Sequence, residues 1–254
     1  MYIIYTEFST RVGEKLLERG HGMKNVKLLL AGCVLASATG AFASSKCATS
    51  ASITLQDRYV IQEIGVVADP NPVLQTSTTL ACKNGWSFNF WTSTALDARG
   101  KYGNRGYGDE IDFTVGYEKE LGNLVLEASL AYFVIADFAR AQDDLVQAYV
   151  QIARPVTLGL IRVVPFLRIT QWVGMGELKN ETFVRAGANF QVEVSPKWTL
   201  SGTGSLVHQF EGRTGGLGAV SLSREVGSGV SLSLTGKFTS DVSPVAAIGI
   251  TKIF

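Results

Sequence analysis

Side-chain polarity in this chain alternates with a period of two residues. The alternation is clear in segments 109–117, 144–152, 160–173 and 230–238. In a β-strand successive side chains point to opposite faces, whereas a helical period of 3.6 residues would scatter such sets. Segment 109–117 shows the pattern: one face carries Ile111, Phe113, Val115 and Tyr117, and the other carries Glu110, Asp112, Thr114 and Gly116. The sequence therefore predicts strands with one apolar and one polar face.

Twelve such segments can be placed along the chain, and most have the 9–14 residues that cross a bilayer at a steep tilt. We predict strands near 53–66, 73–81, 86–96, 109–118, 123–136, 144–154, 160–172, 180–193, 197–209, 216–226, 229–239 and 244–254. The polar faces are mostly Ser, Thr, Gln and Asn, whereas a soluble sandwich would expose Lys and Glu to water. No amphipathic helix is visible that could cover the apolar faces.

Composition agrees with strands as the membrane-crossing elements. The 254 residues are 46% hydrophobic and only 18% charged, and the mean hydropathy is +0.18. A helical membrane protein needs runs of about 20 apolar residues. Only the stretch 28–43, close to the N-terminus, approaches this length. Multi-pass helical architecture is excluded, and a net charge of +1 gives no reason to expect nucleic-acid binding.

The predicted connections alternate between short and long. Short ones lie near 83–85, 120–122, 156–159, 195–196 and 227–228, and longer ones near 97–108, 137–143, 174–179 and 210–215. Short periplasmic turns and longer external loops are typical of an outer-membrane barrel. We expect an all-β transmembrane antiparallel barrel of about 12 strands, with 10 as the alternative and with both termini periplasmic.

The N-terminal part of the chain resembles an export signal. Residues 23–43 combine two lysines, an apolar run and a final Ala41-Phe42-Ala43, which predicts a secretory signal peptide cleaved after Ala43. Residues 1–22 are either an upstream mis-start or an unusually long n-region. Cys33 ends a lipoprotein-like box, but the apolar run before it is too short. The barrel domain is therefore expected to span 44–254, in the cell outer membrane.

Two features support an outer-membrane destination. The chain ends on Phe254, with Ile250 and Ile248 on the same face, which resembles the C-terminal signature read by the barrel-insertion machinery. Trp86, Tyr117 and Trp198 fall at apolar-face positions beside short turns, where an interfacial aromatic belt is expected. The expected partners are outer-membrane lipids and that machinery.

After cleavage, Cys47 and Cys82 are the only cysteines left. In an oxidising exported compartment, two cysteines are candidates for a disulfide. Cys47 follows the cleavage site and Cys82 adjoins a predicted periplasmic turn, so both lie on one side of the membrane. We expect a disulfide that pins the N-terminal segment to the barrel rim.

The charged side chains of the polar faces are the candidate functional residues. Charges are costly in lipid, so they are expected to face the lumen. The candidate pore-lining residues are Glu110, Asp112, Glu127, Arg162, Arg168, Arg185 and Lys237. We expect the acidic group on 109–127 and the basic group on 160–185 to face each other across part of the lumen and to create a transverse field that selects small hydrophilic solutes. In the alternative, these groups pair and plug a closed barrel.

The whole mature chain resembles the small outer-membrane porins of Gram-negative bacteria. The resemblance is carried by Gly-Trp-Ser-Phe-Asn-Phe-Trp at 85–91 and Asp-Glu-Ile-Asp-Phe-Thr-Val-Gly-Tyr at 109–117. In size and strand number the chain is also similar to twelve-stranded oligosaccharide porins. The resemblance implies a barrel and a channel class, and it implies neither a substrate nor a cofactor.

Two other functions remain open at this stage. A structural or adhesive barrel would act through its outer loops, of which 97–108 is the longest. A barrel-borne lipase or deacylase would need a histidine with a nucleophile or acid, and the mature chain has only His208 without a partner constellation. We therefore expect no enzyme, no metal site and no cofactor.

Overall fold

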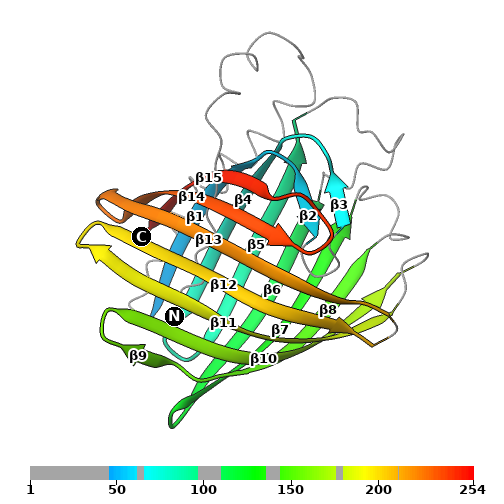
Figure 1. Ribbon diagram of the computed structural model, residues 1–254, viewed down its shortest axis with the longest axis horizontal. Helices are drawn as coiled ribbons and strands as arrows, with labels where there is room; N and C mark the ends of the chain where they lie inside the picture. Colours follow the sequence, from blue (N-terminus) through cyan, green and yellow to red (C-terminus); the bar gives the residue numbers. More distant parts are fainter. Residues whose placement is uncertain (1–45, 62–65, 97–109, 136–143, 176–179, 211) are drawn as a thin grey trace.

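The computed structural model describes residues 46–61, 66–96, 110–135, 144–175, 180–210 and 212–254. It forms a closed antiparallel barrel of twelve strands (Figure 1). The predicted segments 1–22 and 23–43 lie outside the described residues. The barrel strands are β1 (Cys47–Gln56), β4 (Val73–Cys82), β5 (Trp86–Ala95), β6 (Glu110–Leu121), β7 (Leu124–Ile135), β8 (Leu145–Ala153), β10 (Ile161–Gly174), β11 (Glu181–Ser195), β12 (Trp198–Gln209), β13 (Thr214–Gly227), β14 (Val230–Thr239) and β15 (Val245–Ile253).

Each barrel strand pairs with its neighbours in chain order, and the circle closes where β1 pairs with β15. Three short strands lie outside this circle. The strand β9 (Val156–Leu158) extends the turn between β8 and β10, and β2 (Tyr59–Ile61) pairs with β3 (Val66–Asp69) as a separate hairpin. No helix in the described part of the chain is long and apolar enough to cross a membrane.

The twelve-strand prediction is confirmed, and the ten-strand alternative is excluded. The prediction was wrong for the first strand, which was placed at 53–66. The structure has β1 at Cys47–Gln56, followed by the β2–β3 hairpin. Residues 47–52 are small (Cys-Ala-Thr-Ser-Ala-Ser), so their two faces differ little in polarity. Pairing with β15 and β4 on either side makes this segment a strand all the same.

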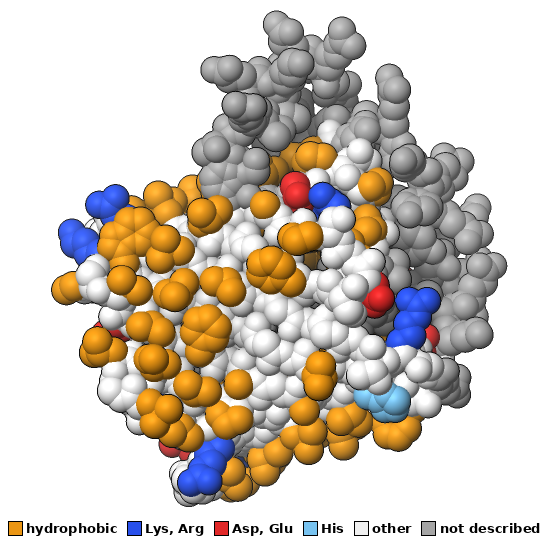
Figure 2. Space-filling view, viewed as in Figure 1, with side chains coloured by type: hydrophobic (Ala, Val, Ile, Leu, Met, Phe, Trp, Pro, Cys, Tyr) orange, Lys and Arg blue, Asp and Glu red, His pale blue; other side chains and the backbone are white. Residues whose placement is uncertain are grey.

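The two faces of the barrel differ as the alternation predicts. On β10 the outward-facing Leu167 and Ile169 are 47% and 54% exposed, whereas the inward-facing Phe166 and Thr170 on either side of this pair are buried. Figure 2 shows hydrophobic side chains spread over the outer surface, with charged groups mainly toward its borders. The apolar excess of the composition is therefore on the outside of the barrel.

The short connections all lie at the barrel end that carries Cys47 and Ile253, which we call the turn end; the opposite end is the loop end. Several turns use glycine in the left-handed region, as at Gly85 (φ 93°) and Gly122 (φ 65°). Gly85 is also crowded, because a Cβ atom there would lie 2.1 Å from the carbonyl oxygen of Glu118. Its backbone N–H donates to Cys82, and its carbonyl accepts from the N–H of Glu118.

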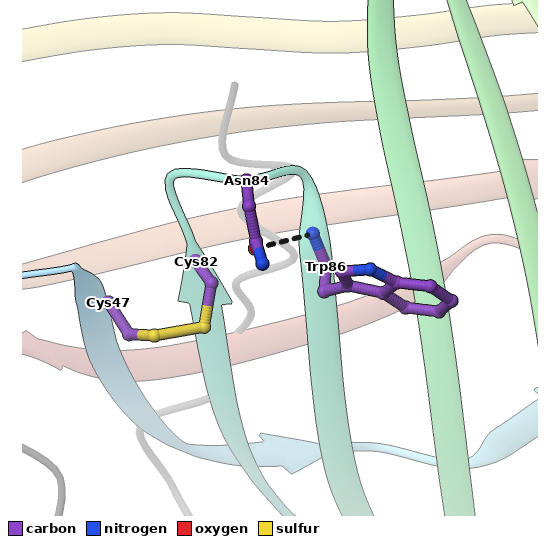
Figure 3. Close-up of a disulfide and its surroundings, with 4 residues drawn as sticks. All are labelled: Cys47, Cys82, Asn84 and Trp86. Carbon is purple, nitrogen blue, oxygen red and sulfur yellow. Dashed lines mark hydrogen bonds between the residues drawn. A yellow bond between two sulfur atoms is a disulfide. The ribbon is translucent and has the colours of Figure 1, made fainter.

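A disulfide joins Cys47 to Cys82 at the turn end (Figure 3). The two residues are direct partners in the β1–β4 ladder, and the N–H of Lys83 donates to the carbonyl oxygen of Lys46 beside them. On the other side of β1, the N–H of Phe254 donates to the carbonyl oxygen of Thr49. The first strand is thus held on both edges close to the point where the barrel closes.

The two turn glycines give a testable contrast in stability. Gly122→Ala should cost about 1–2 kcal/mol of unfolding free energy, because only the left-handed backbone is penalised and no atom lies within 4 Å of the new Cβ. Gly85→Ala should cost roughly 3 kcal/mol or more, because the new Cβ also collides with backbone. Urea unfolding in detergent micelles, followed by tryptophan fluorescence, measures both. Equal losses would contradict the assigned turn geometry.

Candidate functional site: the barrel lumen

The structure places all seven candidate pore-lining residues on strand positions whose side chains point inward. Paired residues of neighbouring strands point to the same face of the sheet, and the partners of these residues lie on the inner face. Glu127, Arg168 and Arg185 lie halfway along the barrel, Arg162 lies near the turn end, and Glu110 and Asp112 lie near the loop end. Lys237 stands apart from the other six, on β14.

The mid-barrel residues form one row, which we call the ladder: Arg185, Arg168, Gln151, Tyr149 and Glu127. Arg185 joins the row as the register partner of Arg168, and hydrogen bonds and a ring contact link the other four. Gln151 sits at its centre, accepting from Arg168 Nε (3.0 Å) and donating to Glu127 Oε2 (2.8 Å). Tyr149 donates its hydroxyl to Glu127, and the Arg168 guanidinium lies 3.9 Å from the centre of the Tyr149 ring. The ladder therefore presents cations, an aromatic face and an anion on one stretch of wall.

Glu127 and Arg168 adjoin each other instead of facing across the lumen, so the expectation was wrong for this pair. Only β8 separates β7, which carries Glu127, from β10, which carries Arg168. Sequence spacing could not show this, because the two residues are far apart along the chain while the barrel brings their strands together. Any field between these two residues runs along one wall.

The wall made by β12 to β15 has a different chemistry, dominated by hydroxyl groups. Thr235 donates to Ser221 (2.7 Å), Ser233 donates to the carbonyl oxygen of Gly249, and Arg185 Nε reaches Ser205 Oγ (2.8 Å) at its border. Lys237 contributes a cation here, donating to Gln56 Oε1 at 3.2 Å. The lumen is thus asymmetric: one side is charged and aromatic, and the other is nearly neutral.

An apolar collar lies toward the loop end of the lumen. It consists of Leu145, Trp172, Phe183, Val207 and Leu217, all buried, from five different strands. The rings of Trp172 and Phe183 meet edge to face with centroids 4.9 Å apart. Because a water-filled lumen favours polar side chains, a collar of this kind needs an apolar partner inside the barrel.

The β2–β3 hairpin supplies that partner. Ile61 packs against the collar. Tyr59 from the same strand contacts β5 and β6: its ring lies 5.8 Å from that of Trp91, and its hydroxyl donates to Glu110 Oε2 at 2.7 Å. The hairpin is therefore held inside the barrel by contacts with two separate parts of the inner wall. Figure 1 shows it in cyan at one end of the barrel.

His208 lies on the outer face near the loop end. Its Nδ1 is 2.9 Å from Thr214 Oγ1, and its ring lies 6.0 Å from that of Phe210. In the described part of the chain no group of three or more His, Cys, Asp or Glu side chains could hold a metal ion. The surroundings of His208 thus contain a threonine and an aromatic ring, and none of its contacts among the described residues is with an acid.

Sequence reasoning missed the collar and the hairpin. The polar faces were characterised by their Ser, Thr, Gln and Asn residues, although Trp172 and Phe183 occupy the same face. Two large aromatic residues on an otherwise polar face were the available signal. The expected loop 97–108 lies outside the described residues.

Comparison with known proteins shows the fold and nothing finer. No protein-family model and no curated protein matches the sequence. Among solved structures, the KdgM porin is 10% identical, with a TM-score of 0.55 over 81% of this chain and 98% of that one. The KdgM porin in complex with disordered oligogalacturonate gives 0.54 at 10% identity, over 81% and 98%. The NanC porin gives 0.52 at 8% identity, over 80% and 98%. The chain therefore has the barrel fold of these outer-membrane porins.

Loosening the hairpin should widen the path through the lumen. The double variant Tyr59→Phe/Ile61→Ala removes the hydrogen bond to Glu110 and the contact with the collar. These losses should weaken docking by roughly 1–2 kcal/mol, or about tenfold in the docked-to-undocked ratio. Conductance in planar bilayers should then rise. Arg58→Ala is the matched control, because Arg58 directly precedes the hairpin and its guanidinium pairs with the adjacent Asp57. Unchanged conductance in the double variant would show that the hairpin does not limit passage.

Proposed function

We propose that the chain is exported to the cell outer membrane and acts there as a porin-like channel. It would allow passive diffusion of small hydrophilic solutes through a charge-lined lumen, with both termini on the periplasmic side. The observation that carries the proposal is the combination of an apolar outer face with the Arg185–Arg168–Gln151–Glu127 ladder inside a closed barrel. The fold shared with KdgM and NanC porins supports it.

The ladder suggests how solutes would be handled. A guanidinium group binds carboxylates and other planar anions with directed hydrogen bonds, and Tyr149 offers a ring face for sugar or apolar groups. Glu127 beside them accepts hydrogen bonds from hydroxyl groups. Solutes with hydroxyl and anionic groups would therefore travel along β7, β8 and β10, with the hydroxyl-rich wall opposite. Oligogalacturonate, seen with the KdgM porin, is a suitable anionic probe.

The surroundings of the barrel fit the same proposal. Trp86, Trp198 and Phe254 lie exposed at the turn end, and the Trp86 and Tyr117 rings are 5.1 Å apart. Such a group of aromatic residues suits one membrane interface. Outer-membrane lipids, the barrel-insertion machinery acting on Phe254, and small hydrophilic solutes are the proposed partners. We propose neither catalysis nor nucleic-acid binding.

A structural or adhesive barrel without conductance is the second candidate function. The hairpin and the collar favour it, because together they place apolar side chains inside the barrel. In that case the loop end would act as a binding surface and the lumen would stay shut. A lipase or deacylase centred on His208 ranks third, because the contacts of His208 in the described part of the chain are with Thr214 and Phe210.

Electrical recording from the purified mature chain in planar bilayers tests the channel proposal. The wild type should show discrete current steps and a measurable ion preference. Changing Arg162, Arg168 and Arg185 together to Ala should raise the cation-to-anion permeability ratio several-fold, because three of the four candidate lumen cations are lost.

Arg224→Ala is the matched control, because Arg224 lies on the outer face against Trp198 (5.4 Å). It should leave the reversal potential unchanged. Absence of any current from folded wild-type protein would favour the adhesive barrel. An unchanged reversal potential in the triple variant would rule out the arginine lining as the selectivity element.

A further inference from the structure

Two carboxyl groups lie side by side under the hairpin at the loop end. Glu110 and Asp112 alternate on β6, so both point into the barrel, and their carboxyl groups contact each other. They are only 5% and 9% exposed. Two adjacent acidic groups removed from water repel each other and lose hydration, so something must compensate for their charge.

The described residues supply hydrogen bonds but no cation. Tyr59 donates to Glu110 Oε2 at 2.7 Å, and this is a neutral donor. Among the described side chains, no Lys or Arg forms an ion pair with either carboxylate. The pair therefore keeps its negative charge unless a proton or a bound ion neutralises it.

Two further oxygen atoms at the same place have no partner. Ser93 is the register partner of Glu110 on β5, is 2% exposed, and its Oγ has no hydrogen-bond partner among the described residues. Asp112 Oδ1 likewise has no hydrogen-bond partner among the described residues. A buried polar atom left unpaired costs about 1–3 kcal/mol. A proton shared between the two acids would relieve their repulsion, but it would leave Ser93 Oγ unsatisfied.

We propose that Glu110, Asp112 and Ser93 bind a calcium ion at the loop end of the lumen. The donors are all oxygen atoms, which hard cations prefer, and the two carboxylates match a divalent charge. Calcium accepts irregular coordination and can complete its shell with water, whereas magnesium demands near-octahedral geometry. Because Tyr59 bonds to Glu110, the ion would also fix the position of the hairpin. The site does not depend on whether the barrel conducts.

Terbium luminescence gives a direct test, because this ion replaces calcium and emits when a nearby tryptophan transfers energy to it. Trp91 is the register partner of Asp112, so it lies next to the site. The experiment uses the mature chain refolded in detergent micelles. We expect saturable Tb³⁺ emission on tryptophan excitation, displacement by Ca²⁺, and much weaker displacement by Mg²⁺ at the same concentration. Trp91→Phe should remove most of the emission.

The variants locate the site. Asp112→Asn and Glu110→Gln should each weaken Tb³⁺ binding at least about tenfold, since each removes one of two ligand charges. Glu118→Gln is the matched control, because Glu118 is another inward-facing acid of β6, farther toward the turn end; it should bind as the wild type does. If an acid variant fails to fold, Ser93→Ala provides the same test with a smaller loss. No saturable emission from wild type, or equal binding by wild type and Asp112→Asn, would overturn the proposal in favour of a shared proton.

Discussion

Closure of the sheet between β1 and β15 is the constraint on which the rest of this protein depends. A sheet edge leaves a row of backbone donors and acceptors without partners, and a closed barrel removes both edges. Seven register pairs join β1 to β15, from Ser50–Ile253 to Gln56–Ala247. The Cys47–Cys82 disulfide ties the same strand to β4 on its other side. With twelve strands closed in this way, every second side chain of a strand points into the lumen.

The inward-pointing side chains of each strand determine what the lumen contains. Going along β10 from the turn end, Val164 and Phe166 belong to a small apolar cluster with Ala153, Arg168 belongs to the ladder, and Trp172 belongs to the collar. Along this wall the polar ladder thus lies between two apolar clusters. Its hydrogen bonds hold the ladder side chains in fixed positions. The hairpin adds Ile61 to the cluster nearer the loop end.

Much of the architecture could be predicted from the sequence, because a period of two is a strong signal when one face meets lipid. Residues 161–170 show this: their two faces were assigned from the alternation alone, and the structure agrees. The signal failed at 47–52, where small residues dominate, and at 57–72, where tertiary contacts of Tyr59 and Ile61 determine the path. The adjacency of Glu127 and Arg168 depends on strand order around the barrel, which a single sequence encodes only weakly.

The central claim is that successive residues of one strand alternate between two environments: one set lines a water-filled lumen, and the other set faces lipid. It can be measured on β10 with single cysteines in proteoliposomes and a charged, membrane-impermeant thiol reagent. Cys47 and Cys82 are bonded to each other and do not interfere. Cysteines at Arg162 and Arg168, which face inward, should react readily, and those at Leu167 and Ile169, which face outward, should not. Absence of reaction at both inward positions, or equal reaction at all four, would contradict the account.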